Sequence, residues 1–308
     1  MRVAYLILAH IDAKHIARLT KKITCGTDNF VFIHVDLKSD INKFKKELID
    51  CSQYILLSER VDVRWGGFSS ISATINLMRA ATTFGHFDRY VLLQGLEYPL
   101  KDNKYIEDFF EKNKNTEFIL AQNISKTSSI NEKHKYRLYH FLDQKHKLFF
   151  RILGKINSIF IKIGVIPHFK RNYVKDLNGK KMDIYQGCAQ FGLTNRAIKY
   201  ILNFHDRNSR FNKYFKTMYA SDEAYFHTII YNSPFISATP DGKGVTRPHL
   251  TDFENLTYFE YPNEVTIFKN ASDWENLKNK SFLFFRKATS ESEELLDTID
   301  KIHNESLL

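Results

Sequence analysis

The chain has 308 residues, of which 43% are hydrophobic and 26% are charged, a composition that excludes an intrinsically disordered protein and suits one large domain. Its formal charge of +10 favours an anionic partner, such as nucleic acid, an acidic membrane surface or a phosphorylated substrate. The three cysteines are widely spaced, which argues against a disulfide framework and favours a reducing compartment.

Strands and helices alternate in the first part of the chain. Continuous apolar runs predict buried strands at residues 3–10, 30–36 and 89–93. Shorter strands are expected at 54–57, 61–65 and 117–121, and helices at 13–23, 69–84 and 102–111. This alternation predicts an α/β fold with a mostly parallel central sheet flanked by helices, in which residues 1–121 form a nucleotide-binding half.

The pattern changes after residue 121. Residues 122–183 are rich in Lys, His, Asn and aromatic residues and predict an insertion that carries a helix or two. The last part, residues 184–308, predicts a strand and three helices, at 187–193, 195–204, 221–230 and 291–302. Because no repeat or low-complexity linker separates these parts, we expect residues 1–308 to form a single domain.

Two glycines, Gly66 and Gly67, stand between a predicted strand and a helix that begins near Ser69 or Ser70. Glycines at this place allow a sharp turn and a close approach of the backbone to a ligand. The helix N-terminus after them offers free N–H groups to an anion or to a hydroxyl-rich ligand. The alternative is a tight turn that only connects the two elements, with Trp65 in the core.

A second motif runs from Leu92 to Leu100, at the carboxyl end of a predicted buried strand. Open α/β sheets bind ligands at this end of their strands. Glu97, two residues before Pro99, is placed to accept hydrogen bonds from sugar or ribose hydroxyls. The alternative is an acid in a solvated turn.

These motifs belong to an ordered set that spans residues 3 to 287. The set comprises residues 5–10, 33–36 with Lys38, 65–69, 92–100, 186–194, 214–223 and 284–287. Together these segments resemble the core-2/I-branching β-1,6-N-acetylglucosaminyltransferase family, which also includes peptide xylosyltransferases. The resemblance implies a glycosyltransferase A-type fold and a transfer that inverts the anomeric carbon. It also divides the chain into a nucleotide-sugar-binding half, the helical insertion, and an acceptor and catalytic half.

The resemblance further implies catalysis without a metal ion or any other cofactor. Most enzymes of this fold hold the donor diphosphate on a divalent metal through an Asp-x-Asp motif, and no two aspartates in this chain are separated by one residue. Basic side chains then stabilise the leaving diphosphate: Arg286 as a bidentate clamp and Lys287 as a point charge. Lys287 is the stronger candidate by resemblance, and Arg247 or Lys269 is a candidate for a second basic group. The alternative for Arg286 and Lys287 is a solvated strand edge.

Glu223 is the expected catalytic base. An inverting transfer needs one carboxylate to take the proton from the attacking hydroxyl, on the face opposite the leaving group. Asp222 lies about 100° further round a helix, so both side chains cannot reach one proton, and we assign Asp222 to helix capping. The alternative is that both residues are acids that stabilise a helix N-terminus.

The resemblance assigns the remaining site residues. Those expected to bind the donor are His10, Asp36, Trp65, Gly66, Gly67, Ser69, Glu97, Arg286 and Lys287. Gln190 and Tyr261 are expected to contact the acceptor. Glu97 stands where the family has Asp, and residues 188–190 replace a Ser-rich stretch. His10 and His34, near the ends of predicted strands, are expected to satisfy buried hydrogen bonds rather than to bind metal.

The expected reaction moves a sugar from a UDP-sugar to a glycan hydroxyl, in surface polysaccharide or lipid-linked glycan synthesis. The family's usual donor is UDP-N-acetylglucosamine, and relatives use UDP-xylose or UDP-glucuronate. No secretory signal, membrane anchor or bilayer-spanning apolar run is recognised, and the cysteine pairs of animal members are missing. We therefore expect a bacterial, cytoplasmic enzyme.

Two further interpretations concern the basic residues. Residues 149–167 combine an apolar face with Arg151, Lys155 and Lys162, which predicts contact with anionic lipid at the inner membrane surface. The alternative for this segment is a core helix packed on the sheet. Aromatic and basic residues also interleave over 133–171, as in proteins that stack on single-stranded nucleic acid. Since no nucleic-acid-binding motif accompanies them, a nucleic-acid-binding protein is the alternative function and no nucleic acid partner is expected.

Overall fold

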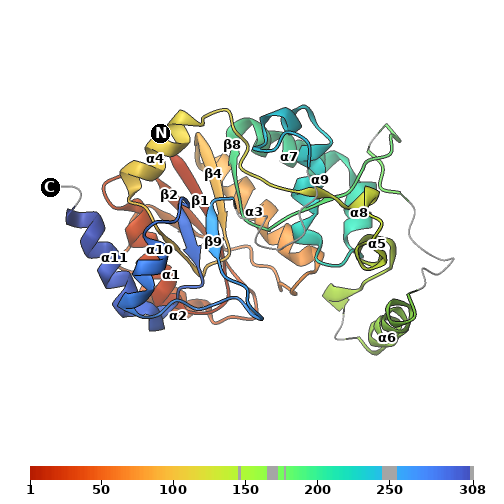
Figure 1. The fold of residues 1–308 in the computed structure, drawn as a ribbon, viewed down its shortest axis with the longest axis horizontal. Coiled ribbons are helices and arrows are strands. Elements are labelled where there is room, and N and C mark those ends of the chain that lie inside the picture. The colour runs from red at the N-terminus through yellow and green to blue at the C-terminus, as the bar shows by residue number, and fades with distance from the viewer. Residues whose placement is uncertain (145–146, 165–172, 177, 245–254, 306–308) are drawn as a thin grey trace.

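A five-stranded sheet forms the centre of the molecule in the computed structural model, which describes residues 1–144, 147–164, 173–176, 178–244 and 255–305 (Figure 1). Its strands are β1 (Val3–Ala9), β2 (Phe30–Val35), β3 (Tyr54–Leu56), β4 (Arg89–Leu93) and β8 (Phe191–Thr194). The order is β3-β2-β1-β4-β8, with β8 antiparallel to β4 and the other pairs parallel. The predicted α/β fold with a mostly parallel sheet is confirmed.

Helices cover both faces of this sheet (Figure 1). One face packs against α3 (Phe68–Phe84), α7 (Asn195–Arg207), α8 (Ser209–Phe215) and α9 (Tyr225–Tyr231). The other packs against α1 (Ala13–Thr24), α2 (Ile41–Glu47), α4 (Asn103–Lys112), α10 (Trp274–Leu277) and α11 (Glu293–Glu305). Successive strand residues alternate between the two cores: Leu6 lies in the first and Ile7 in the second. Burial on both faces explains the continuous apolar runs of the strand sequences.

Two small sheets extend the fold. The first consists of β5 (Glu97–Pro99), β10 (Phe284–Arg286) and β9 (Thr257–Phe259), with β10 in the middle, antiparallel to β5 and parallel to β9. Its register places Arg286 opposite Glu97, so residues far apart in the sequence meet beside the carboxyl end of β4. The second sheet pairs β6 (Gln122–Asn123) with β7 (Tyr185–Gln186) and closes the two ends of the insertion.

Several predicted elements differ in the structure. Residues 61–65 form no strand, because the N–H of Val61 donates to Nε2 of His34, 2.9 Å away, rather than to a strand neighbour. Residues 117–121 make only an isolated bridge, between Phe118 and Gly192. The predicted helix at 221–230 is divided into a 3-10 turn, η3 (Ser221–Glu223), and α9, because the carbonyl of Glu223 accepts a hydrogen bond from the N–H of Gly187 at 2.9 Å.

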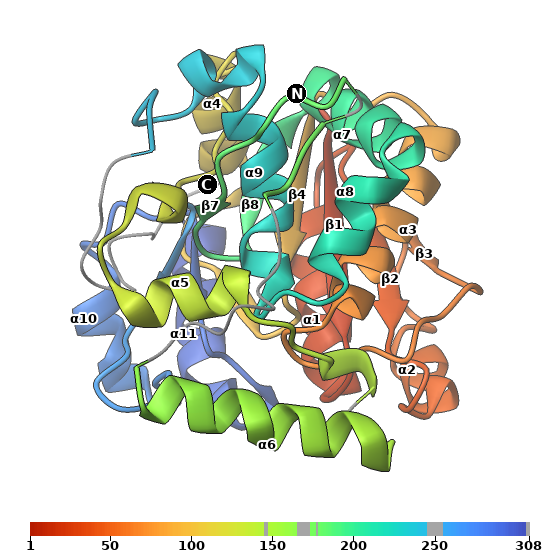
Figure 2. The same ribbon diagram turned by 90° about the vertical axis from the view of Figure 1, so that its right-hand side faces the viewer.

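The insertion contains η1 (Ile124–Lys126), α5 (Ile130–Arg137), η2 (Leu142–Gln144) and α6 (Leu148–Lys162), as the prediction of a helix or two required. Figure 2 shows α6 at the edge of the molecule, away from the central sheet. No described side chain of α6 is buried, so its interpretation as a core helix is wrong. Residues 165–167 of the predicted membrane segment lie outside the described residues. Among the described helices, none is long and apolar enough to cross a membrane.

Candidate active site

A cavity of about 600 Å³ opens at the carboxyl ends of β1, β2 and β4. His10 follows β1, Asp36 follows β2 and Gln94 follows β4, and all three side chains line it. Open α/β sheets bind ligands at this edge. The predicted site residues that line the cavity are His10, Asp36, Trp65, Gly66, Gln190, Glu223, Tyr261, Arg286 and Lys287. The other predicted residues, Gly67, Ser69 and Glu97, lie behind its wall.

Glu223 projects into the cavity from η3. Nε2 of Gln186 donates a hydrogen bond to its Oε2 at 2.9 Å, and the bond from Gly187 holds its backbone. Burial, and then the charge of neighbouring Asp222, raise the pKa of Glu223 to about 7. A carboxylate with this pKa, facing a ligand cavity, has the properties of a general base that works near neutral pH.

Asp222 also lines the cavity, which corrects its assignment to helix capping. Neither η3 nor α9 has a side-chain cap, and the backbone at Ala224 departs from helical geometry between them. Burial raises the pKa of Asp222, and a hydrogen bond with Ser70 on α3 opposes that shift. Asp222 therefore joins α3 to the loop that carries Glu223, and its negative charge contributes to the raised pKa of Glu223.

The N-terminus of α3 is capped from within the protein. Asp143 of η2 accepts hydrogen bonds from the hydroxyl of Ser69 at 2.6 Å and from the N–H of Ser69 at 3.2 Å. A Cβ on Gly67 would lie 2.0 Å from Oδ1 of Asp143, so any other residue at position 67 would require that carboxylate to move. The N–H of Ser69 is therefore bonded to Asp143 and is not one of the free N–H groups that were predicted at this helix N-terminus. Gly66, with φ 70°, makes the sharp turn that the motif predicted.

Glu97 is completely buried beneath the cavity floor, which excludes a solvated turn. Its Oε2 accepts the N–H of Gln94 at 2.8 Å, and its Oε1 accepts a hydrogen bond from Nε2 of Gln190 at 3.1 Å. Nη1 of Arg286 lies 3.5 Å from the same Oε1. Glu97 thus holds Gln190 and Arg286 in place, and it does not itself line the cavity.

Lys287 brings a positive charge to the cavity next to Arg286. Within the described part of the chain its ammonium group has no ion-pair partner, whereas Arg286 faces Glu97. Lys269 pairs with Glu291 and does not line the cavity. Arg247, the other candidate for a second basic group, lies outside the described residues.

Asp36 and Lys38, which also line the cavity, form an ion pair. Nζ of Lys38 lies 2.8 Å from Oδ2 of Asp36 and 2.7 Å from Oδ1 of Asp62. His34 is buried and accepts the hydrogen bond from Val61, as expected. His10 is exposed at the end of β1, so the expectation that it satisfies a buried hydrogen bond is wrong.

Aromatic side chains form the rim of the cavity. Trp65 is 73% exposed, which excludes its alternative placement in the core, and Tyr261 is 49% exposed. The ring of Trp65 packs edge-on against Tyr219, with 5.9 Å between the ring centroids. Aromatic faces of this kind are suited to pack against the apolar face of a sugar ring.

Sequence reasoning missed three residues that organise the site, Gln186, Asp143 and Tyr219, and it gave Asp222 a different role. Gln186 stands at the start of a quoted motif, so its position beside Gly187 was the available signal. Tyr219 likewise lies within the motif segment 214–223, whereas Asp143 had no such signal, because its role depends on a contact between segments that are far apart in the sequence.

Comparison with known proteins places the chain in a family. The sequence profile described as Core-2/I-Branching enzyme matches residues 3–246. Xylosyltransferase 2 of Rattus norvegicus is 21% identical over 248 residues, which cover 78% of this chain and 26% of that protein. Xylosyltransferase 1 of Homo sapiens is 21% identical over 248 residues, covering 78% and 23%. The chain spans about a quarter of the length of these relatives.

Solved structures show more distant similarity. The apo form of mouse xyloside xylosyltransferase 1 has a TM-score of 0.35 and 11% identity, covering 92% of this chain and 97% of that one. A putative glucose-1-phosphate thymidylyltransferase from Bacillus anthracis, in complex with a sucrose, has a TM-score of 0.27 and 14% identity, covering 65% and 74%.

The sheet and its cavity define an α/β protein with a cavity at the carboxyl ends of parallel strands, the edge at which open α/β sheets bind ligands. Since the family profile covers most of the chain, this chain belongs to the Core-2/I-Branching enzyme family, which is a family of glycosyltransferases. The resemblance drawn from the ordered motifs is confirmed.

Proposed function

We propose that the protein is an inverting glycosyltransferase that moves a sugar from a UDP-sugar to a glycan hydroxyl. The observation that carries the proposal is one cavity that contains both a carboxylate with a pKa near neutrality, Glu223, and the cationic pair Arg286 and Lys287. An acceptor hydroxyl needs a carboxylate to take its proton, and a diphosphate leaving group needs cations to stabilise its charge.

The proposed reaction uses each group at a defined atom. Glu223 takes the proton from the acceptor hydroxyl while the acceptor oxygen attacks the anomeric carbon of the donor. The bond from that carbon to the diphosphate oxygen breaks on the opposite face, so the configuration inverts and UDP leaves. Lys287 and Arg286 stabilise the negative charge that develops on the diphosphate. Asp36, Gly66 and Trp65 bind other parts of the donor, whereas Gln190 and Tyr261 contact the acceptor.

The proposed donor is UDP-N-acetylglucosamine, used without a metal ion. The absence of an Asp-x-Asp motif in the sequence and the place of Lys287 in the cavity support a cationic side chain in the role of the metal. UDP-xylose is a second candidate donor, because the similar curated proteins are named xylosyltransferases.

We further propose that the enzyme works in the cytoplasm of a bacterium and adds to a lipid-linked glycan or a surface polysaccharide. Support comes from α6, whose exposed apolar side chains and basic residues are suited to contact an anionic membrane surface. The nucleic-acid-binding alternative is disfavoured, because the family to which the chain belongs consists of transferases.

UDP release tests this function directly. The purified protein is incubated with a panel of UDP-sugars and glycan acceptors, with and without a chelator. We expect release with UDP-N-acetylglucosamine that survives chelation. Activity that vanishes with the chelator and returns with manganese would contradict the metal-free proposal, and no release with any donor would contradict the function itself.

A further inference from the structure

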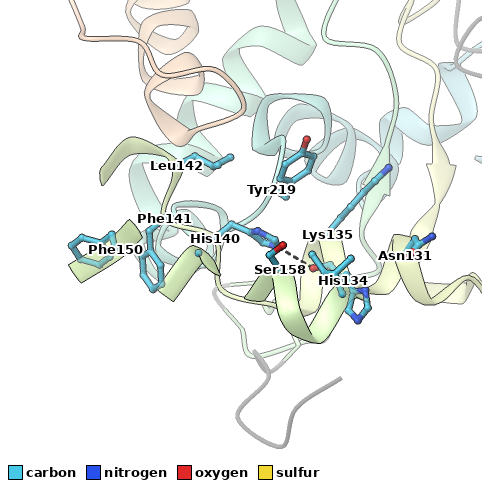
Figure 3. Close-up of a pocket in the computed structure, with 11 residues that line it drawn as sticks. Asn131, His134, Lys135, His140, Phe141, Leu142, Phe150, Ser158 and Tyr219 are labelled. Atoms are coloured by element: carbon cyan, nitrogen blue, oxygen red, sulfur yellow. Dashed lines mark hydrogen bonds between the residues drawn. The ribbon is translucent and has the colours of Figure 1, made fainter. Parts of the chain in front are cut away.

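A second pocket, of about 450 Å³, lies between α5, η2 and α6, outside the catalytic cavity. Figure 3 shows its lining side chains, which come mostly from the insertion. Phe141, Leu142, Phe150 and Ile161 make its walls largely apolar. The volume is within the usual range for small-molecule sites, which bury an apolar ligand and orient it through a few polar groups.

His134 supplies such a polar group. Its side chain lines the pocket from α5, and it is 2% exposed. Neither Nδ1 nor Nε2 of His134 has a hydrogen-bond partner within the part of the chain that the structure describes. A buried imidazole without a partner is costly, and because both ring nitrogens are covered, a ligand atom reaches them only when the pocket wall shifts.

Tyr219 separates this pocket from the catalytic cavity. On the pocket side its ring lies 5.5 Å from that of His140, measured between centroids, and on the other side it packs against Trp65 at the cavity rim. The carboxylate of Glu223 is near enough for its charge to contribute to the raised pKa of Tyr219, after the larger effect of burial. The pocket therefore adjoins the acceptor side of the site, where the proton-abstracting group lies.

Most of the exposed apolar side chains of α6 lie on the face of the helix opposite the residues that line the pocket. Phe149 is 65% exposed and Ile159 is 58% exposed, on a helix with no buried described side chain. Gly154 lines the pocket, and the space beside it is empty: a Cβ built there meets no atom within 4 Å.

We propose that this α5–α6 pocket binds the hydrocarbon chain of a lipid-linked acceptor. The inference rests on the proposed function and names the part of the protein that selects its acceptor. The chain lies against Phe150 and the open face at Gly154, and His134 makes a hydrogen bond to a polar atom at the junction of chain and glycan. The glycan then extends past Tyr219 and Trp65 to Glu223.

Paired glycosides test the proposal. The probes are the octyl and methyl glycosides of glucose, galactose and N-acetylglucosamine, used below micelle-forming concentrations. Binding is measured by calorimetry, and transfer by UDP release. We expect octyl glycosides to bind at least about tenfold more tightly than methyl glycosides, because each buried methylene contributes about 0.8 kcal/mol. The same preference is expected in kcat/KM.

Gly154→Leu fills the pocket with a residue that favours helix, so the variant is expected to fold. We expect its octyl-to-methyl ratio to fall to about one, whereas the exposed control Lys147→Leu keeps the wild-type ratio. His134→Phe keeps the aromatic volume and is expected to weaken octyl glycoside binding by about threefold to tenfold.

The outcomes separate this inference from the function on which it rests. UDP release with equal preference for octyl and methyl glycosides would overturn the pocket assignment and leave the transferase intact. A ratio unchanged by Gly154→Leu would also overturn it. No UDP release from any donor would overturn the proposed function, and the acceptor assignment with it.

Discussion

Glu223 is the residue whose surroundings determine its chemistry most clearly. Its pKa of about 7, against an ordinary value of 4.5, means that the carboxylate loses its proton only as pH rises through neutrality. A base must be deprotonated to act, so we expect kcat/KM to fall as pH decreases below about 7. Since the hydrogen bond from Gln186 lowers this pKa, Gln186→Leu should move the acidic limb to higher pH. A profile that stays flat through neutrality would contradict both expectations.

Glu223→Gln should lower turnover by on the order of 10²-fold or more and leave UDP binding nearly intact, because the carboxylate acts on the acceptor rather than on the diphosphate. The variant should also melt no lower than wild type above pH ~7, since a carboxyl with a raised pKa destabilises the fold when it ionises. Rates and thermal melts of the same preparations check both points. A wild-type rate would remove Glu223 from the role of base.

Lys287→Ala should weaken UDP binding and slow transfer together, because a phosphate contact exists in the ground state and strengthens as charge develops. Lys269→Ala is the matched control: its ammonium group pairs with Glu291 outside the cavity. Calorimetry with UDP separates the two. If the control variant lost affinity and Lys287→Ala did not, the diphosphate would have to bind elsewhere.

At this scale the sequence identified residue types better than it identified their contacts. Glu97 and Ser69 were expected to touch the donor, yet Glu97 supports Gln190 and Arg286 from below, and Ser69 bonds to Asp143. Both roles depend on partners from distant segments, which a motif read along the chain does not reveal.

Among the elements, α3 depends on a cap that comes from the insertion. Gly67→Ala would place a Cβ 2.0 Å from Oδ1 of Asp143 and force the carboxylate away from Ser69. We expect a loss of roughly 1–2 kcal/mol in the free energy of unfolding, the usual cost of losing a helix cap. Denaturant titration measures this cost.

A double variant tests this explanation, and a glycine on another helix gives a contrasting case. Asp143→Ala in the Gly67→Ala background should cost little more, because both changes remove the same interaction. Gly154→Ala, on a helix where the added Cβ meets no atom, should stabilise the protein by about 0.5–1 kcal/mol. Additive losses at residues 67 and 143 would show that the cap is not their shared contribution.

The long elements were predictable from the sequence and the short ones were not. Strand β1 and helix α1 have apolar patterns that suffice to locate them. In contrast, β5 has only three residues, and it is a strand because it pairs with β10, which lies far from it in the sequence. The 3-10 turn at Glu223 forms because the N–H of Gly187 donates a hydrogen bond to the carbonyl of Glu223. Local helix propensity does not include this contact.

The whole molecule presents α6 at its edge, and the proposed membrane contact belongs to this scale (Figure 2). We expect the protein to float with anionic vesicles at low salt and not with neutral ones. The attraction between basic side chains and anionic lipid head groups is screened by salt ions, so it is strong only when salt is low. A variant with Lys155→Glu and Lys162→Glu should lose this binding. No flotation with anionic vesicles at low salt would leave α6 without a membrane role.

The arrangement of distant segments is the part of the molecule that the sequence did not predict. The ordered motifs predicted the family and the sheet, but not that residues 284–286 pair beside residues 97–99, or that Tyr219 separates two pockets. These features follow from tertiary packing, whose free energy is distributed over many weak contacts.

The bond between Asp143 and Ser69 has a consequence for protein engineering. Because the segment from residue 122 to 183 supplies a structural part of the turn around Gly67, it is not an interchangeable module. When a chimera receives this segment from a relative, the segment must carry an acid at the position of Asp143. Otherwise the recipient's turn loses its support. Exchange of acceptor specificity between family members should therefore succeed when residues 66–69 and 142–144 are transplanted as a unit.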